Sequence, residues 1–90
     1  MFISRLEWDE DRVQHIARHG IEPDEVWEVC EDPRHLARRE GRNRYRLYGQ
    51  TTEGRYVFVV LEQFKGTVYK LITARDMTTG EKHHFRRLRT

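Results

Sequence analysis

The hydrophobic pattern of the C-terminal half is the feature that most constrains the fold. From Arg44 onward apolar and polar residues alternate with a period of two, which predicts strands over residues 44–50, 55–63 and 67–75. The sequence TTEG at 51–54 and the pair Lys65-Gly66 are turn signals between these strands. Residues 56–61 are apolar without interruption, as expected of a central strand covered on both faces. The chain is therefore expected to form an antiparallel meander.

The N-terminal third carries the signals of a short strand and two helices. Residues 2–8 alternate, which places Phe2, Leu6 and Trp8 on one face; Trp8 and Trp27 are expected in the core. Asp9 is expected to cap a first helix that ends at Gly20 and buries Val13, Ile16 and Ala17. A second helix is expected to open at Pro23 and stop at Asp32-Pro33.

A short edge strand around residues 35–38 is expected before the meander, and a helix capped by Thr78 after it. Phe85 and Leu88 are expected to join this last helix to the core. The predicted fold is α+β: an antiparallel meander with two N-terminal helices and one C-terminal helix, in the order β-α-α-β-β-β-β-α. Ninety residues correspond to one domain, expected over residues 1–90.

Charge is distributed unevenly along the chain. Residues 1–32 carry ten acidic side chains and three arginines, whereas residues 33–90 carry 14 basic and five acidic ones, giving −7 and +9. The basic part fits phosphate or an acidic partner, and the alternative is that acidic helices simply pack beside a basic sheet. The single cysteine, Cys30, excludes an internal disulfide and fits a reducing cytoplasm. With no long apolar run, a cytoplasmic protein without membrane contact is expected.

The stretch 68–87 joins an apolar strand ending at Arg75 to a helix rich in basic residues. An arginine in this position fits an anion site, and it also fits an ordinary strand–helix junction. Thr78 and Glu81 have the spacing of a capping box, which is the alternative to a general-base role for Glu81. The helix then presents a basic face that binds the phosphates of a nucleic acid, binds an acidic partner or is merely solvated, composed of Lys82, His83, His84, Arg86 and Arg87.

Aromatic and basic residues interleave on the predicted sheet. Tyr45 and Tyr48 are candidates to stack an unpaired base, although sheet aromatics often belong to the core. Nearby cations that would bind the phosphates of such a strand are Arg44, Arg46 and Lys70. Alternation places Arg44 and Arg46 on one face with Tyr48, and it places Arg75 on one face with Tyr69, Leu71 and Thr73. Only the pairing register decides whether the two sets meet.

His15 and His19 lie four residues apart and share a helix face, as two metal ligands would. No further ligands follow at the spacing of a metal site, so neither a metal nor another cofactor is expected. His19 is instead expected to complement the dipole at the helix C-terminus, or to act as a catalytic acid or base.

Several short motifs occur together, in an order that covers nearly the whole chain: Glu7-Trp8-Asp9, His19-Gly20, Asp32-Pro33, Asn43-Arg44-Tyr45, Gly49, Gly54, Ile72-Thr73-Ala74-Arg75, and Thr78 followed by Glu81 and Phe85. With this set the sequence resembles the BrnT family of bacterial toxins. The resemblance implies a RelE-like fold and a ribonuclease that inhibits translation. It also implies a partner antitoxin with a ribbon-helix-helix DNA-binding domain, and a toxin–antitoxin complex that represses its own operon.

The resemblance further implies roles for particular residues. The family's strand-end arginine falls on Arg75, its helix glutamate on Glu81 and its arginine after the basic turn on Arg44. Its His-Gly pair is His19-Gly20. The sequence departs from the family at Thr73, where a serine is common, and at Phe85, where a tyrosine is frequent, so no phenol can act as an acid there.

Three functions remain open. The first is a toxin that cuts RNA internally without a metal, in which Arg44, Arg46 and Arg75 stabilise the charged transition state. The second is a module that keeps the fold but has lost catalysis, and binds a protein partner or nucleic acid through its basic face. The third is a component that acts only with its antitoxin on operator DNA. It ranks last, because the chain has no recognisable DNA-reading helix.

Overall fold

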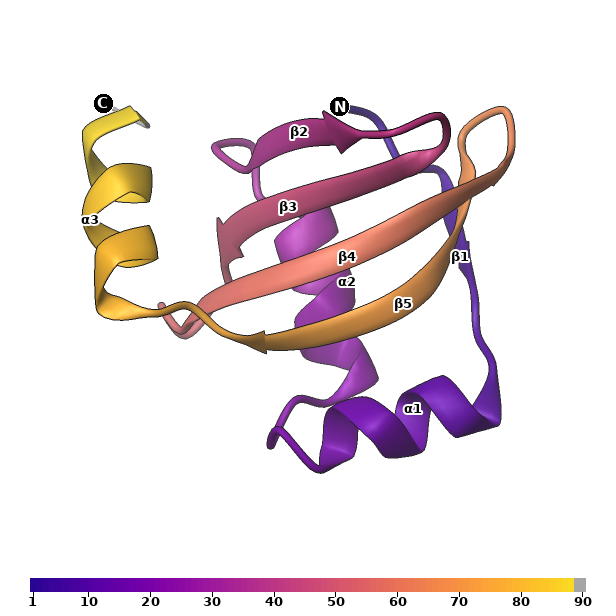
Figure 1. Cartoon of the computed structure of the whole chain (residues 1–90). Coiled ribbons are helices and arrows are strands. Elements are labelled where there is room, and N and C mark those ends of the chain that lie inside the picture. Colours follow the sequence, from indigo (N-terminus) through magenta and orange to yellow (C-terminus); the bar gives the residue numbers. More distant parts are fainter. Residues whose placement is uncertain (89–90) are drawn as a thin grey trace.

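The computed structural model describes residues 1–88, so the last two residues of the expected 1–90 domain lie outside the described part. The predicted element order is confirmed (Figure 1): β1 (Arg5–Glu7), α1 (Glu10–Ala17), α2 (Pro23–Glu31), β2 (Leu36–Glu40), β3 (Arg44–Gln50), β4 (Tyr56–Lys65), β5 (Val68–Asp76) and α3 (Thr79–Leu88). Strands β2 to β5 each begin within one residue of the expected position. Along this part of the chain the period-two pattern and the turn residues agree with each other.

The sheet is mixed rather than purely antiparallel, which corrects the predicted fold. Its strand order is β1-β5-β4-β3-β2, and β2 to β5 form the antiparallel meander with β2 at one edge. The N-terminal strand β1 pairs in parallel with β5, with Leu6 opposite Tyr69. Turn signals in the sequence indicate only which strands are joined by hairpins. Parallel neighbours such as β1 and β5 need a longer connection, so no turn signal predicts their pairing. The likeness to RelE stays a prediction.

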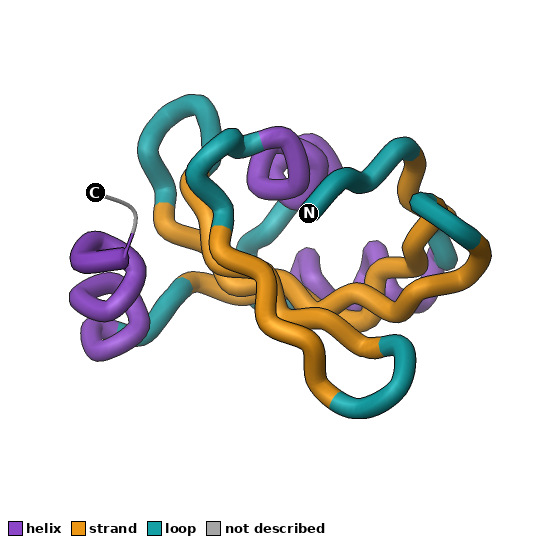
Figure 2. The backbone as a smooth tube through the Cα atoms, turned by 90° about the horizontal axis from the view of Figure 1, so that it is seen from above, coloured by secondary structure: helices purple, strands orange, loops and turns teal. Residues whose placement is uncertain are grey.

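Different helices cover the two faces of the sheet. On the inner face, defined by Val59 at the centre of β4, the strands pack with Ile16 of α1 and Val29 of α2. On the outer face, defined by Phe58, the sheet packs with Phe85 of α3. Figure 2 shows α3 set apart from the other two helices. The central strand β4 is therefore covered on both faces, as its apolar run predicts.

Local signals place the ends of the first two helices as predicted. Asp9 caps α1, because its Oδ1 accepts the backbone N–H of Asp11 at 2.8 Å. Gly20 follows α1 with a φ of 74°, a left-handed conformation that glycine adopts without strain. Helix α2 begins at Pro23, and Asp32 is its C-cap residue. Within residues 1–88, no helix combines the length and the apolar character needed to cross a bilayer.

Three residues expected to be buried are exposed instead. Trp8 is 42% exposed because β1 ends at Glu7, so strand alternation does not extend to it. Ala17 lies at the end of α1 and is also exposed. Leu88 is 48% exposed, and Phe85 is the only buried side chain in the described part of α3. At the N-terminus Phe2 is exposed as well, and the inner core is filled there by neighbouring apolar residues, Ile3 and Leu6.

Candidate active site

A β-bulge in β5 decides which face Arg75 occupies. Leu71 and Thr73 pair with adjacent residues of β4, so Ile72 between them has no partner there. One extra residue shifts the alternation of side chains to the opposite face. Arg75 therefore lies on the outer face opposite Phe58, with its guanidinium carbon 4.3 Å from the ring centroid.

This bulge corrects the predicted grouping of β5 side chains. Tyr69 and Leu71 belong to the inner core, whereas Arg75 stacks on the outer face. The register also answers the question that alternation left open. Tyr48, Phe58 and Arg75 stand opposite one another across β3, β4 and β5, and the rings of Tyr48 and Phe58 are 5.1 Å apart. Tyr48 and Arg75 thus meet on one face across a single aromatic ring.

Glu81 joins Arg75 to the start of α3. Its carboxylate accepts two N–H bonds from Arg75, at 2.9 and 3.1 Å, and the backbone N–H of Thr78 at 2.8 Å. The Thr78 hydroxyl in turn accepts the N–H of Glu81 at 3.2 Å, which completes the predicted capping box. The hydrogen bonds from Arg75, with further help from Thr78, lower the pKa of Glu81. A carboxylate that is held ionised and fully engaged is a poor general base.

A hollow of about 310 Å³ lies between α3 and the outer face. Its lining comes from β2, β3 and α3, and consists of Leu36, Arg38, Arg46, Tyr48, Gly80, Glu81, His84 and Phe85. Arg46 also forms an exposed ion pair with Glu40. The hollow therefore combines two arginines, an imidazole and a phenol, with Arg75 bound to Glu81 at its border.

The sequence did not single out Arg38, and it named His84 only as one member of the basic run of the last helix. Arg38 Nη2 lies 3.4 Å from His84 Nε2. His84 is one helical turn beyond Glu81 and shares its side of α3, so helical spacing from Glu81 would have favoured it over His83. Arg38 carries no comparable local signal. It reaches the hollow because β2 pairs with β3, which places it opposite Arg46.

Arg44 and Lys70 lie on the outer face but away from the hollow. Arg44 forms an ion pair with Glu62 at 3.4 Å, and Lys70 stands opposite Glu62 on the next strand. The Lys70 ammonium lies 4.5 Å from the centroid of the Phe64 ring. Arg44 is four residues from Tyr48 along β3, about 13 Å at the usual rise of ~3.3 Å per residue. It does not join Arg75.

Tyr45 and His19 also lie apart from the hollow. Tyr45 packs against the inner core, with its ring edge-on to Tyr69 at 5.7 Å. His19, just after α1, packs edge-on against His15 at 5.2 Å, and no hydrogen bond or ring contact within residues 1–88 joins it to Arg75. His15 itself contacts the Thr73 hydroxyl at 3.0 Å. In the same residues no three His, Cys, Asp or Glu side chains are grouped as metal ligands would be.

The basic residues of α3 divide between two environments. Arg86 donates to the Tyr56 hydroxyl at 3.0 Å, and its guanidinium carbon is 4.9 Å from the ring centroid. The Lys82 ammonium is 5.9 Å from the same ring. His83 and Arg87 are exposed. The predicted basic face is therefore partly anchored to the sheet through Tyr56.

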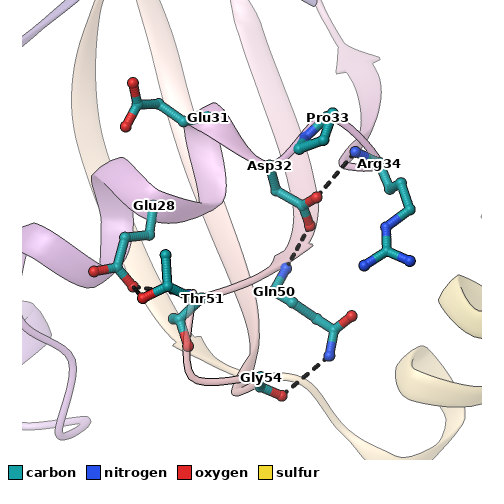
Figure 3. Close-up of a pocket in the computed structure, with 9 residues that line it drawn as sticks. Glu28, Glu31, Asp32, Pro33, Arg34, Gln50, Thr51 and Gly54 are labelled. Carbon is teal, nitrogen blue, oxygen red and sulfur yellow. Dashed lines mark hydrogen bonds between the residues drawn. The ribbon is translucent and has the colours of Figure 1, made fainter.

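A second hollow of about 370 Å³ lies between the end of α2 and the turn after β3 (Figure 3). Its polar groups bind one another. Asp32 accepts the backbone N–H groups of Arg34 and Gln50 at 2.9 and 2.8 Å, and Glu28 accepts from the backbone and hydroxyl of Thr52 at 3.0 and 3.1 Å. These contacts hold the turn against α2, so we assign this hollow a structural role.

The fold and the site together define a small α+β protein with an arginine-lined hollow between its last helix and its sheet. Residues 8–81 match the family model described as the ribonuclease toxin BrnT of type II toxin–antitoxin systems, and the chain belongs to this family. Its fold is similar to the crystal structure of the Brucella abortus ribonuclease toxin BrnT, with a TM-score of 0.69 and 19% identity over 83% of this chain and 97% of that one. A comparison with curated proteins gave no match.

Proposed function

We propose that this chain is the toxin of a type II toxin–antitoxin pair and that it cuts RNA internally, without a metal, in the hollow beside α3. Membership of the BrnT family supports RNA as the target. The observation that carries the assignment is the convergence of Arg38, Arg46 and His84 in one hollow, with Arg75 at its border. Cations and an imidazole are the groups that such a reaction needs.

In this proposal the 2′-hydroxyl attacks the adjacent phosphorus, and the bond to the 5′-oxygen breaks. One group must take the hydroxyl proton, another must protonate the leaving oxygen, and cations must stabilise the extra negative charge between these steps. Arg38 and Arg46 would bind the phosphate oxygens, for which their planar forks are suited. His84 would exchange protons with the reacting oxygens, because histidine is the side chain whose charge changes near neutral pH.

Arg75 and Glu81 would act mainly by positioning. Both oxygens of Glu81 bind Arg75, and one of them also binds the Thr78 N–H, so this carboxylate has little capacity to take a proton. The pair instead fixes the first turn of α3, and with it His84, at a set distance from the sheet. We therefore expect Arg75→Ala to abolish cleavage through loss of this geometry, and Arg75→Lys to restore it only partly, because a lysine cannot make the bidentate contact.

We further propose that cleavage inhibits translation and that a ribbon-helix-helix antitoxin neutralises the protein. Family membership supports an antitoxin partner. The exposed basic side of α3, with His83 and Arg87, offers a surface for an acidic segment of that partner. Operator DNA would be bound only by the toxin–antitoxin complex, and the proposed location is the cytoplasm.

The test compares two neighbouring histidines of α3. Expression should arrest growth, and the purified protein should cut RNA in the presence of EDTA. His84→Asn should lower the cleavage rate about 10²–10⁴-fold, the usual contribution of one acid or base. His83→Asn is the matched control and should cleave normally, because both histidines are exposed but only His84 lines the hollow. Intact RNA together with harmless expression, or equal effects of the two substitutions, would contradict the proposal.

One observation favours a second candidate, a module that binds RNA or a protein without cutting. Phe85 stands where a tyrosine would supply an acid, and its ring is buried against the outer face. If catalysis has been lost, RNA binding should weaken steeply with salt, as phosphate contacts do, and no product should form at any enzyme concentration.

A further inference from the structure

Helix α3 covers only part of the outer face and leaves the rest open. Its buried contact, Phe85, packs over the part around Phe58. Figure 1 shows α3 at one end of the sheet and the β4–β5 hairpin toward the other. Between them the row of Arg44, Glu62 and Lys70 crosses three strands, and all three side chains lie on the outer face. This open part begins next to Arg46, which lines the hollow.

An exposed aromatic ring stands at the far end of this row. Phe64 is 55% exposed, although it lies within a strand, and only Lys70 makes a ring contact with it among the described residues. A large apolar side chain in such a position does not contribute to folding through burial in the core of this chain. An exposed ring beside a cation is the combination with which proteins stack an unpaired base and bind its phosphate.

The acidic groups of this surface are weakly held to their partners. Arg44 and Glu62 form an ion pair at 3.4 Å with side chains 49% and 33% exposed, and Arg46 pairs with Glu40 in a similarly open setting. Exposed ion pairs of this kind contribute little free energy, typically below about 1 kcal/mol. A phosphate can therefore replace a carboxylate at either arginine.

The neighbouring ring of Trp8 has different surroundings. It shares a hollow of about 280 Å³ with Lys70 and Arg12, but three carboxylates also line this hollow, those of Glu7, Asp9 and Glu62. Glu7 and Asp9 line only the Trp8 side and repel phosphate there, whereas Glu62 is paired with Arg44. An RNA chain is therefore expected to pass on the side of Lys70 where Phe64 lies.

We propose that this open part of the outer face, Arg44, Lys70 and Phe64, is a second subsite for single-stranded RNA. This subsite rests on the proposed function, because the RNA strand that it holds is the same strand that enters the hollow beside α3. Lys70 is five residues from Arg75 along β5, about 16 Å at ~3.3 Å per residue, so the subsite binds nucleotides several positions from the reacting phosphate. Phe64 stacks one base, and Lys70 and Arg44 bind the flanking phosphates.

The experiment measures binding separately from cleavage. The probes are fluorescent 2′-O-methyl oligoadenylates of about 4 and about 16 nucleotides, which bracket common site sizes for single strands. They carry no 2′-hydroxyl to attack, so binding is measured whether or not the protein cleaves RNA. The variants are Phe64→Ala, Phe64→Tyr and Lys70→Gln. Phe2→Ala is the control, because Phe2 is 73% exposed and lies outside the surface.

Phe64→Ala and Lys70→Gln should each weaken binding of the longer probe about fivefold or more and leave the shorter one unchanged. Phe64→Tyr should restore the affinity, since it keeps the ring, and Phe2→Ala should have no effect. Equal affinities of Phe64→Ala and the unaltered protein for the longer probe would overturn the subsite. So would a loss confined to antitoxin binding, which would assign the surface to the protein partner. Failure of the unaltered protein to cut RNA would reject only the proposed nuclease activity and not the subsite.

Discussion

At the scale of single residues, Arg55 binds three separate parts of the chain. Its guanidinium donates to Asp76 at the end of β5, at 2.7 and 3.1 Å, and to Glu25 in α2, at 3.0 and 3.2 Å. It also donates to the carbonyl of Gly20 at 2.8 Å. The sequence marks Arg55 only as the start of a strand. Its role as a junction between both N-terminal helices and the sheet arises from residues far apart in the chain.

We expect Arg55→Met to destabilise the fold by about 2 kcal/mol, because the carboxylates of Glu25 and Asp76 would lose charge-assisted hydrogen bonds. The free energy of unfolding in urea measures this. Arg5→Met is the matched control: Arg5 pairs with Glu7 at 3.0 Å on side chains that are 66% and 42% exposed, so its loss should cost almost nothing. Similar losses in the two variants would show that Arg55 does not hold these elements together.

A second residue-scale prediction concerns His35. Its two ring nitrogens are buried without a hydrogen-bond partner among residues 1–88, and burial, followed by the charge of the N-terminal amine, lowers its pKa from 6.5. Because the folded state binds this proton less readily than the unfolded chain, its stability is complete above pH 6.5 and falls as the pH drops below that value. We expect His35→Gln to reduce this slope between about pH 5 and pH 7. An unchanged slope in thermal unfolding would contradict the burial argument.

At the scale of elements, helix α2 packs on β3 at Gly49. A Cβ at this position would lie 3.1 Å from Val29 Cγ1 and 3.3 Å from both Asp32 Oδ2 and the Cβ of His35. The close approach explains why a glycine interrupts the alternating side chains of β3. Tyr48, the preceding residue of β3, lines the hollow on the opposite face.

Two glycine substitutions should therefore have opposite effects on stability. Gly49→Ala should destabilise by about 1–3 kcal/mol through overpacking. Gly80→Ala should be neutral or stabilising by up to about 1 kcal/mol, because Gly80 lies in α3 with nothing within 4 Å of an added Cβ. Thermal unfolding of the two variants under one set of conditions measures both changes. A destabilised Gly80→Ala would show that α3 depends on a conformation special to glycine.

At the scale of the whole molecule, charge is separated across the sheet. The first turns of α1 and α2 are acidic, with Glu10, Asp11, Asp24 and Glu25. Arginines and Lys70 gather on the outer face, opposite the packing of these helices. Both interpretations of the uneven charge therefore describe this structure. The acidic helices pack beside a basic sheet, and the basic face stays open to a polyanion.

The salt dependence of RNA binding should report this charge. Log affinity should fall linearly with log salt concentration, and each phosphate contact that is removed should reduce the slope by about 0.7 for a single strand. We expect Arg46→Gln to reduce the slope by about that amount and Arg18→Gln, at the end of α1 on the other side of the sheet, to leave it unchanged. If Arg46→Gln weakened binding with the original slope, Arg46 would act by shape and not by contact with phosphate.

The sequence by itself determined the elements, their order and the helix ends, because these depend on residues a few positions apart. The period-two pattern after Arg44 located the starts of the strands within one residue. The capping box of Thr78 and Glu81 formed as its spacing predicted, because both partners lie in one turn. The family motifs are also local in sequence, and the match of residues 8–81 to the BrnT family model confirms the resemblance that they indicate.

Only the tertiary structure decided which side chains meet. The bulge at Ile72 moved Arg75 to the outer face, and strand pairing brought Arg38 and Arg46 together while leaving Arg44 apart. The parallel pairing of β1 with β5 and the choice of His84 over His83 were settled in the same way. Register, bulges and the seating of a helix depend on contacts between residues far apart in the chain. Local patterns place side chains along an element, and the packing of elements places them around a site.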